Sequence, residues 1–158
     1  MSQTTLDFRL LADHPELTAT LAGWFAAEWS RPGFELNPQE IETNLKERLN
    51  RDRIPLVVLA FQQRQLVATA ALKIQEMETH PQYQYWLGGV YTIATARGQG
   101  HGTAVVQHSA RRAAELGVAD LYLYTNSHAG FYNRLGWQVI ERPLYHGLTV
   151  TIMHKGLT

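Results

Sequence analysis

The stretch Arg97-Gly98-Gln99-Gly100-His101-Gly102 places three glycines within five residues, directly before a segment with helical periodicity. Glycine lets a backbone turn tightly and come close to a ligand. The first N–H groups of a helix have no partners within the helix, and they lie at the positive end of its dipole. The stretch therefore predicts a binding site for an anion such as phosphate or pyrophosphate.

Two well-known nucleotide-binding patterns do not fit this turn. A P-loop requires a lysine directly after its last glycine, and no lysine follows here. The dinucleotide fingerprint requires a third glycine at position 103, which is Thr103 in this chain. The pattern that is present is Arg-x-x-Gly-x-Gly, formed by Arg97, Gly100 and Gly102.

The segments around the turn alternate between the hydrophobic periods of strands and helices, which predicts one mixed α/β domain over residues 1–158. The expected order is β, α, α, β, β, β, α, β, α, β, β. Strands are expected at residues 6–11, 55–61, 66–74, 83–93, 119–125, 137–141 and 148–154. Helices are expected from residue 13, from residue 37, and at residues 100–116 and 129–135.

Two of these strands carry further information. Residues 55–61 are almost entirely apolar and residues 66–74 alternate, which predicts a buried antiparallel hairpin. Inside residues 83–93, the pair Gly88-Gly89 weakens strand pairing and predicts a β-bulge or a close approach of two backbones.

Composition excludes several classes of protein. The chain has 158 residues, 14 basic and 14 acidic residues, and no cysteine. Disulfides, thiolate metal sites and a cysteine nucleophile are therefore excluded, and zero net charge disfavours binding to nucleic acid or a membrane surface. The seven histidines show no ligand spacing, so we expect no metal. Without a targeting segment or an apolar run near ~18 residues, we expect a cytoplasmic protein.

A second motif follows the glycine-rich turn, with Tyr132 thirty residues after Gly102. It reads Ala129-x-x-Tyr132-x-x-Leu135-Gly136-Trp137. Together with Arg97-x-x-Gly100-x-Gly102, it resembles the paired motifs of the GNAT superfamily of acyl-coenzyme A-dependent N-acyltransferases. The order of the expected elements is also similar to this family along the whole chain.

The resemblance implies a mixed, mostly antiparallel sheet of six or seven strands, splayed between the fourth and fifth strands, with about four helices. It also implies that acetyl-coenzyme A binds in the splay as co-substrate and that an amine is the acceptor. The residues implied to bind the cofactor are Val90, Tyr91, Thr92, Arg97, Gly98, Gln99, Gly100, His101, Gly102, Thr103 and Asn126. Thr125 is an alternative to Asn126, and Arg111-Arg112 could reach a phosphate or form a solvated helix face.

The chemistry requires donors for an oxyanion and a proton for the leaving thiolate. A strand N–H at residues 90–92, freed by the splay, could bind the oxyanion. Tyr132 resembles the general acid of the family, and its alternative role is core packing. The general base remains open among Tyr91, His128, His146 and a water molecule.

Aromatic side chains on the first helix and the following loop, Trp24, Trp29 and Phe34, could line an acceptor site, with Glu28 and Glu35 close by. Such a wall suits a cationic amine with an apolar body. Two other functions remain open, namely a sensor that binds coenzyme A without turnover and an interaction domain. A homodimer also remains open.

Overall fold

The structure is a computed structural model that describes residues 5–158. Seven strands form one sheet in the order β1-β2-β3-β4-β5-β9-β6. Their bounds are β1 (Asp7–Leu10), β2 (Leu56–Gln62), β3 (Gln65–Ile74), β4 (Tyr85–Thr92), β5 (Asp120–Thr125), β9 (Thr151–Gly156) and β6 (Gln138–Glu141). Neighbouring strands are antiparallel except β4 and β5, which are parallel. The predicted mixed, mostly antiparallel sheet is confirmed.

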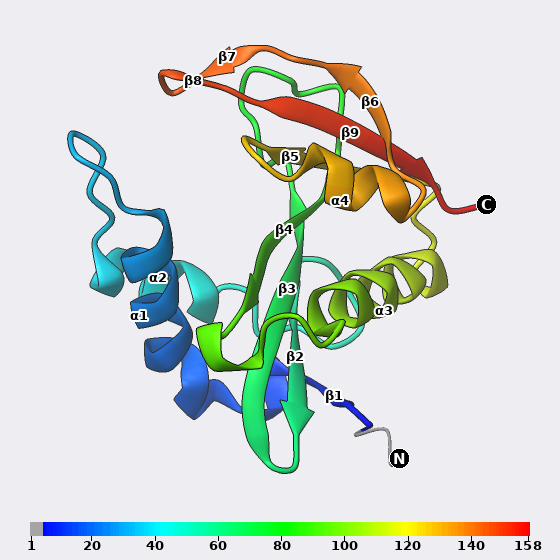
Figure 1. Cartoon of the computed structure of the whole chain (residues 1–158). Helices are drawn as coiled ribbons and strands as arrows, with labels where there is room; N and C mark the ends of the chain where they lie inside the picture. Colours follow the sequence, from blue (N-terminus) through cyan, green and yellow to red (C-terminus); the bar gives the residue numbers. More distant parts are fainter. Residues whose placement is uncertain (1–4) are drawn as a thin grey trace.

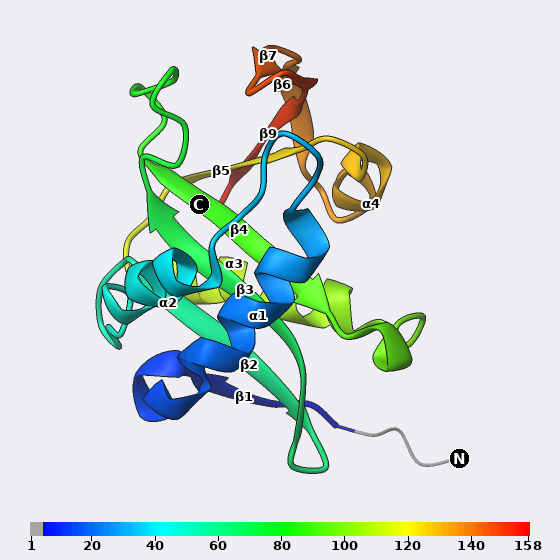
Figure 2. The same ribbon diagram turned by 90° about the vertical axis from the view of Figure 1, so that its left-hand side faces the viewer.

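Four α-helices cover the two faces of the sheet (Figure 1). They are α1 (Thr18–Trp29), α2 (Pro38–Lys46), α3 (His101–Glu115) and α4 (Ala129–Arg134). α1 and α2 pack on one face, where Leu21, Phe25 and Leu45 meet Val57 and Leu59 of β2. α3 and α4 pack on the other face (Figures 1 and 2).

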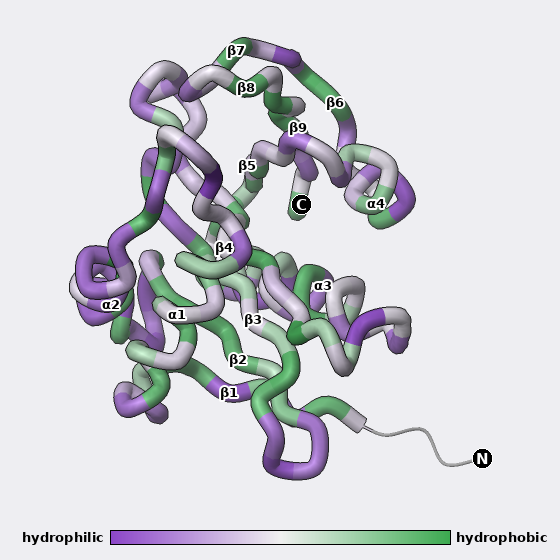
Figure 3. Tube along the Cα trace, turned by 60° about the vertical axis from the view of Figure 1, so that its left-hand side comes forward, coloured by the Kyte–Doolittle hydropathy of each residue, from purple (hydrophilic) through white to green (hydrophobic). Residues whose placement is uncertain are grey.

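Hydrophobic residues are concentrated along the central strands, and the hydrophilic turn between β2 and β3 stands clear of them (Figure 3). The hairpin predicted from residues 55–61 and 66–74 is present, with Val58 opposite Ala70 and Leu56 opposite Leu72. Both strands are buried on both faces, as expected for a sheet covered on each side by helices.

The first helix begins later than predicted. The expected start near Asp13 instead holds two 3-10 turns, Leu11–Asp13 and Pro15–Leu17, and α1 begins at Thr18. His14 between the turns has φ −137° and ψ 55°. The proline that follows it disfavours the helical region for this residue, so the helix is interrupted there.

The C-terminal part also differs from the prediction. Residues 148–154 were expected to form one strand, but they divide into β8 (Leu148–Thr149) and β9. β8 pairs with the unpredicted β7 (Leu144–Tyr145) in a small hairpin. The division falls at Val150, whose N–H donates to the carbonyl of Pro143.

The predicted bulge lies in β4. Ala71 of β3 pairs with Gly88 and Thr69 pairs with Tyr91, so Gly89 and Val90 face the single residue Ala70. Gly89 has φ +58°, in the left-handed region that glycine adopts readily.

The two halves of the sheet separate just beyond this point. In residues 5–158, β4 and β5 share one register pair, Trp86 with Tyr122. The rest of β4 diverges from β5 (Figures 1 and 2), which is the predicted splay between the fourth and fifth strands.

No helix of the described residues is long and apolar enough to cross a membrane. Residues 1–4, on which part of the expectation about a targeting segment rested, lie outside the described residues.

Candidate active site

The glycine-rich turn delivers the chain from β4 to the N-terminus of α3. Gly98 has φ +80° and Gly100 has φ +82°, and open space surrounds the position that a Cβ would take at either residue. Ala104 N–H donates to the carbonyl of Gly100 at 3.0 Å. Among the described residues, the N–H groups of residues 98–103 have no acceptor. The turn therefore presents a row of free donors, as an anion site requires.

The two sequence motifs meet at Gly102. A Cβ at this residue would lie 3.6 Å from Phe131 of α4 and 3.7 Å from the Thr92 hydroxyl of β4. The predicted cofactor residues of β4 and α3 therefore lie beside the helix that carries Tyr132. Both distances are ordinary van der Waals contacts, so a small side chain here is compatible with the fold.

The side chain of Arg97 is engaged with β4 and α1. Its Nε donates to the carbonyl of Thr92 at 3.0 Å, and its Nη2 lies 3.7 Å from a carboxylate oxygen of Glu28. The guanidinium carbon also lies 5.7 Å from the ring centroid of Tyr91. Through these contacts Arg97 connects the turn to β4 and α1. Its contact with the cofactor stays a prediction.

His101 occupies the first position of α3 and is only 5% exposed. Its Nε2 has no hydrogen-bond partner in the described chain. Gln99 is exposed and Thr103 is partly buried. The backbone, rather than any single side chain, is thus the common feature of this half of the site.

Successive residues of β4 face opposite sides of the sheet. Val90 packs into the core under α3, whereas Tyr91 packs against α1, with its ring centroid 5.4 Å from that of Trp24. The predicted β4 residues therefore line both sides of the strand at the splay.

Tyr132 lies in α4 and is 8% exposed. Its hydroxyl makes no hydrogen bond within residues 5–158, and none contributes to the shift of its pKa. Burial raises the pKa of Tyr132 to about 12, so the phenol is protonated at neutral pH. The side chain also packs against Trp137, with ring centroids 6.3 Å apart. Both predicted roles, core packing and a proton donor, are compatible with this position.

Thr125 and Asn126 differ in how many hydrogen bonds their side chains already make within the protein. The Thr125 hydroxyl accepts from the N–H groups of Ser127 at 3.4 Å and His128 at 3.0 Å. Asn126 is exposed, and within the described part of the chain its side-chain oxygen accepts only from the Ser127 hydroxyl at 3.4 Å. Asn126 is therefore the freer of the two for a ligand.

The three predicted candidates for the base lie on different elements. Tyr91 is on β4, and His128 is exposed directly before α4. His146 lies at the tip of the β7–β8 hairpin with φ +48°, and its carbonyl accepts from Arg31 at 2.7 Å. The structure does not bring these three side chains together.

Most side chains of the predicted acceptor wall are exposed, but some of them already contact other residues of the chain. Trp29 and Phe34 are 40% and 41% exposed. However, the guanidinium of Arg31 lies 4.9 Å from the ring centroid of Phe34, and Glu28 lies beside Arg97. The ring face and the carboxylate that were expected to receive a cationic acceptor thus each have a cationic neighbour within the chain.

Sequence reasoning missed an ion pair at the end of β3. Lys73 Nζ lies 3.1 Å from Glu76 Oε1, and both side chains are largely shielded from solvent. The available signal was a lysine near the end of an otherwise apolar strand, followed three residues later by a glutamate.

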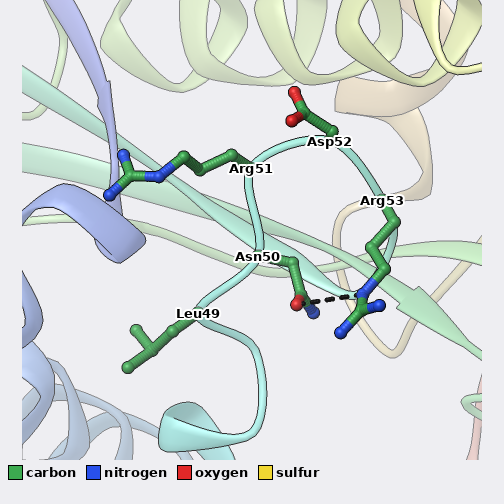
Figure 4. A pocket seen from close by; sticks show the side chains of 5 residues that line it. All are labelled: Leu49, Asn50, Arg51, Asp52 and Arg53. Carbon is green, nitrogen blue, oxygen red and sulfur yellow. Dashed lines mark hydrogen bonds between the residues drawn. The ribbon is translucent and has the colours of Figure 1, made fainter.

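Other features of the described surface are remote from the turn. One hollow is lined by Leu49, Asn50, Arg51, Asp52 and Arg53, with Arg53 Nε donating to Asn50 at 3.1 Å (Figure 4). Arg112 donates to the carbonyl of Arg51 at 2.8 Å, so its side chain is committed to this loop. Among residues 5–158, no group of three or more His, Asp or Glu could hold a metal ion.

Comparison with models of protein families matches residues 17–137 to the acetyltransferase (GNAT) family. The chain therefore belongs to the GNAT family of acetyltransferases, as its two motifs indicated. A search of curated proteins finds no match.

Solved structures share the fold along nearly the whole chain. An acetyltransferase of the GNAT family from Streptococcus pneumoniae is 16% identical, with a TM-score of 0.70 and coverage of 96% of this chain and 99% of the other. An aminoglycoside 6'-N-acetyltransferase complexed with coenzyme A is 16% identical, with a TM-score of 0.73 and coverage of 98% and 97%. A Salmonella typhimurium protein with its cofactor acetyl-coenzyme A is 16% identical, with a TM-score of 0.66 and coverage of 97% and 94%.

Proposed function

We propose that this protein transfers the acetyl group of acetyl-coenzyme A to a primary amine by direct attack in a ternary complex. The observation that carries the proposal is the row of free N–H groups at residues 98–103, which follows the part of β4 that has separated from β5. Neighbours in the same fold bind coenzyme A or acetyl-coenzyme A. The acceptor is a small molecule or an amino group of a peptide.

The binding half of the mechanism uses the backbone. The pyrophosphate of the cofactor accepts from the N–H groups of residues 98–103, at the positive end of α3. Its pantetheine arm lies along residues 90–92, where β4 pairs with β3 and the splay leaves its β5 side without a partner. An N–H of this segment then donates to the thioester oxygen as negative charge develops on it.

The chemical half needs one bond formed and one broken. The amine nitrogen attacks the thioester carbon, the new C–N bond forms, the C–S bond breaks, and the nitrogen releases one proton to solvent as it becomes an amide. Tyr132 donates its phenolic proton to the departing thiolate, and a proton from solvent then restores the phenol. Because burial raises the pKa of Tyr132, the proton is present on the phenol when the sulfur begins to leave.

Two measurements test this function. Acetyl-coenzyme A should raise the melting temperature, because a ligand that binds only the native state stabilises it. The pure protein should also release free thiol when acetyl-coenzyme A and a panel of primary amines are supplied together. Binding without thiol release for any amine would instead favour a sensor, and no thermal shift would favour an interaction domain.

A further inference from the structure

The Lys73–Glu76 pair is unusually shielded for an ion pair. The two side chains are 15% and 21% exposed, and Nζ lies 3.1 Å from Oε1. Of the 14 acidic residues, all except Glu42 and Glu76 are exposed. A shielded ion pair contributes little net stability, because the loss of hydration offsets the attraction. Stability therefore does not explain why this pair lies in a shielded position, which points to a functional reason.

The pair lies over the point where β4 and β5 separate. A Cβ at Gly88 would be 3.1 Å from both Cε and Nζ of Lys73, so the lysine lies directly across this glycine. Gly88 is two residues beyond Trp86, which makes the register pair with β5. The strand therefore lacks a side chain at the position that the ammonium covers.

The pair projects from the face of the sheet that carries α1. Ala71, two residues before Lys73 on β3, packs with Phe25 of α1, and alternate residues of a strand share a face. Figure 2 views the sheet from this side. Across the splay, Tyr124 of β5 has its pKa raised to about 12, by burial first and then by the charges of Glu76 and Glu78.

Two carboxylates reach this region, and they differ in how they are held. Glu78 accepts from the Tyr145 hydroxyl at 2.7 Å, which lowers the pKa of Glu78, and His146 Nε2 lies 3.8 Å from its other oxygen. Glu76 is more shielded, and its hydrogen bond comes from Lys73.

The remaining charge near the pair is cationic. Burial lowers the pKa of Lys73 most strongly, and the charge of Arg48 lowers it further, whereas Glu76 raises it. Glu76 is therefore the carboxylate with a shielded position and a fixed cationic partner at the splay.

On the basis of the proposed function, we propose that Glu76 accepts the proton of a cationic acceptor amine, with Lys73 as the residue that positions the carboxylate. The ammonium donates one proton to the Glu76 carboxylate, and the neutral nitrogen attacks the thioester carbon. The C–S bond then breaks, and the thiolate takes its proton from Tyr132. The nitrogen loses its second proton as it becomes the amide, and this proton returns to the Tyr132 phenolate through solvent, while Glu76 later releases its own proton to solvent. The substrate class is a primary amine that is protonated at neutral pH.

The decisive variant is Glu76→Gln, tested with two kinds of acceptor. With an alkylamine that the wild-type protein acetylates, kcat/KM at pH 7 should fall by about 10²-fold. With hydroxylamine, which is largely unprotonated at this pH, it should change by less than about threefold. The affinity for acetyl-coenzyme A, measured by calorimetry, should remain that of the wild type.

Glu42→Gln is the matched control, because Glu42 is the other acidic residue that is not exposed and it pairs with Lys46 at 3.4 Å. It should leave both acceptors unaffected. Equal losses for both acceptors in Glu76→Gln, or no loss for either, would overturn the proposal, as would the selective loss appearing in Glu78→Gln instead. If the wild-type protein releases no thiol with any amine, the proposed function itself fails, and this inference fails with it.

The positioning role of Lys73 has its own test. Lys73→Met removes the ammonium that donates to Glu76, so kcat for the alkylamine should fall by about 10-fold while its KM and the rate with hydroxylamine stay near the wild-type values. Lys73→Arg, which keeps a cationic donor, should restore most of this loss. Gly88→Ala should reproduce the loss, because its Cβ displaces the end of Lys73 while the backbone at this residue suits alanine. The double variant should lose no more than Lys73→Met alone. A lower melting temperature with unchanged kcat in Lys73→Met would refute the positioning role.

Discussion

The turn before α3 and the face of the sheet that carries α1 are assembled in opposite ways. The turn is one continuous stretch, and its function depends on backbone N–H groups freed by glycine conformations. The α1 face draws side chains from α1, β3, β4, the β3–β4 connection and the β7–β8 hairpin. A local backbone site can be recognised from a short motif, whereas a site of distant side chains becomes visible only when the chain is folded.

The most severe test of this contrast is Gly102→Val. The added methyl groups extend from a Cβ that already contacts Phe131 and Thr92, at a residue whose own N–H is one of the free donors, so they crowd the predicted anion site. Affinity for acetyl-coenzyme A should fall by about 100-fold or more, equivalent to ~3 kcal/mol, in calorimetry. Gly23→Ala on α1, where nothing lies within 4 Å of a Cβ, is the control. Unchanged affinity in a folded Gly102→Val variant would remove the cofactor from this turn.

A second test separates binding from chemistry. Tyr132→Phe removes one hydroxyl that makes no hydrogen bond in the described chain, so the fold should be retained. The turnover number should fall by roughly 10²-fold, the low end for general acid catalysis, with little change in cofactor affinity. Steady-state kinetics and calorimetry on the same preparation measure both. Undiminished turnover would assign the proton to another donor.

Trp29 and Glu28, the α1 residues of this face, should respond more weakly to substitution, and only in the KM for the amine. Trp29→Ala deletes an exposed ring that packs against Phe25 and Tyr91, with centroids 4.9 Å and 6.2 Å away. The KM for an accepted amine should rise by about fivefold through lost apolar contact, without a change in the KM for acetyl-coenzyme A. Glu28→Gln should change the amine KM by less than about twofold, because Arg97 already neighbours this carboxylate. If neither variant alters the amine KM, the acceptor does not contact this wall.

The smallest expected effect concerns the alkaline side of the pH profile. Burial raises the pKa of Tyr132 to about 12, and a raised pKa keeps the proton bound to higher pH. Tyr132 should therefore cause no decline in activity below about pH 11. A descending limb near pH 9 that disappears in Tyr132→Phe would show that the cofactor complex acidifies this phenol strongly.

The sequence predicted the features that depend on short-range rules. The Gly88-Gly89 pair predicted the bulge, and Asn37 before Pro38 predicted the start of α2, where the Asn37 side chain accepts from Gln39 N–H at 2.8 Å. The start of α1 was predicted too early. Asp13 and Pro15 are both common at helix starts, but the two 3-10 turns separate them from the helix.

Contacts between residues that are far apart in the sequence could not be predicted by such rules. No spacing in the sequence indicates that the Tyr145 hydroxyl reaches Glu78, or that Arg31 reaches the carbonyl of His146. The predicted roles of Glu28 and Phe34 depended on their freedom from other partners. Only the folded arrangement shows that Arg97 and Arg31 lie beside them.

The single register pair between β4 and β5 has a consequence for small movements of the two halves of the sheet relative to each other. Ring contacts lie beside this pair, with the Tyr83 and Tyr122 rings stacked at 4.2 Å and the Trp86 and Tyr122 rings tilted at 5.9 Å between centroids. Ring contacts permit small rotations that a ladder of hydrogen bonds resists. A pantetheine arm seated along β4 would act as the missing strand, so amide hydrogens of residues 87–92 should exchange with solvent more slowly once the ligand is bound.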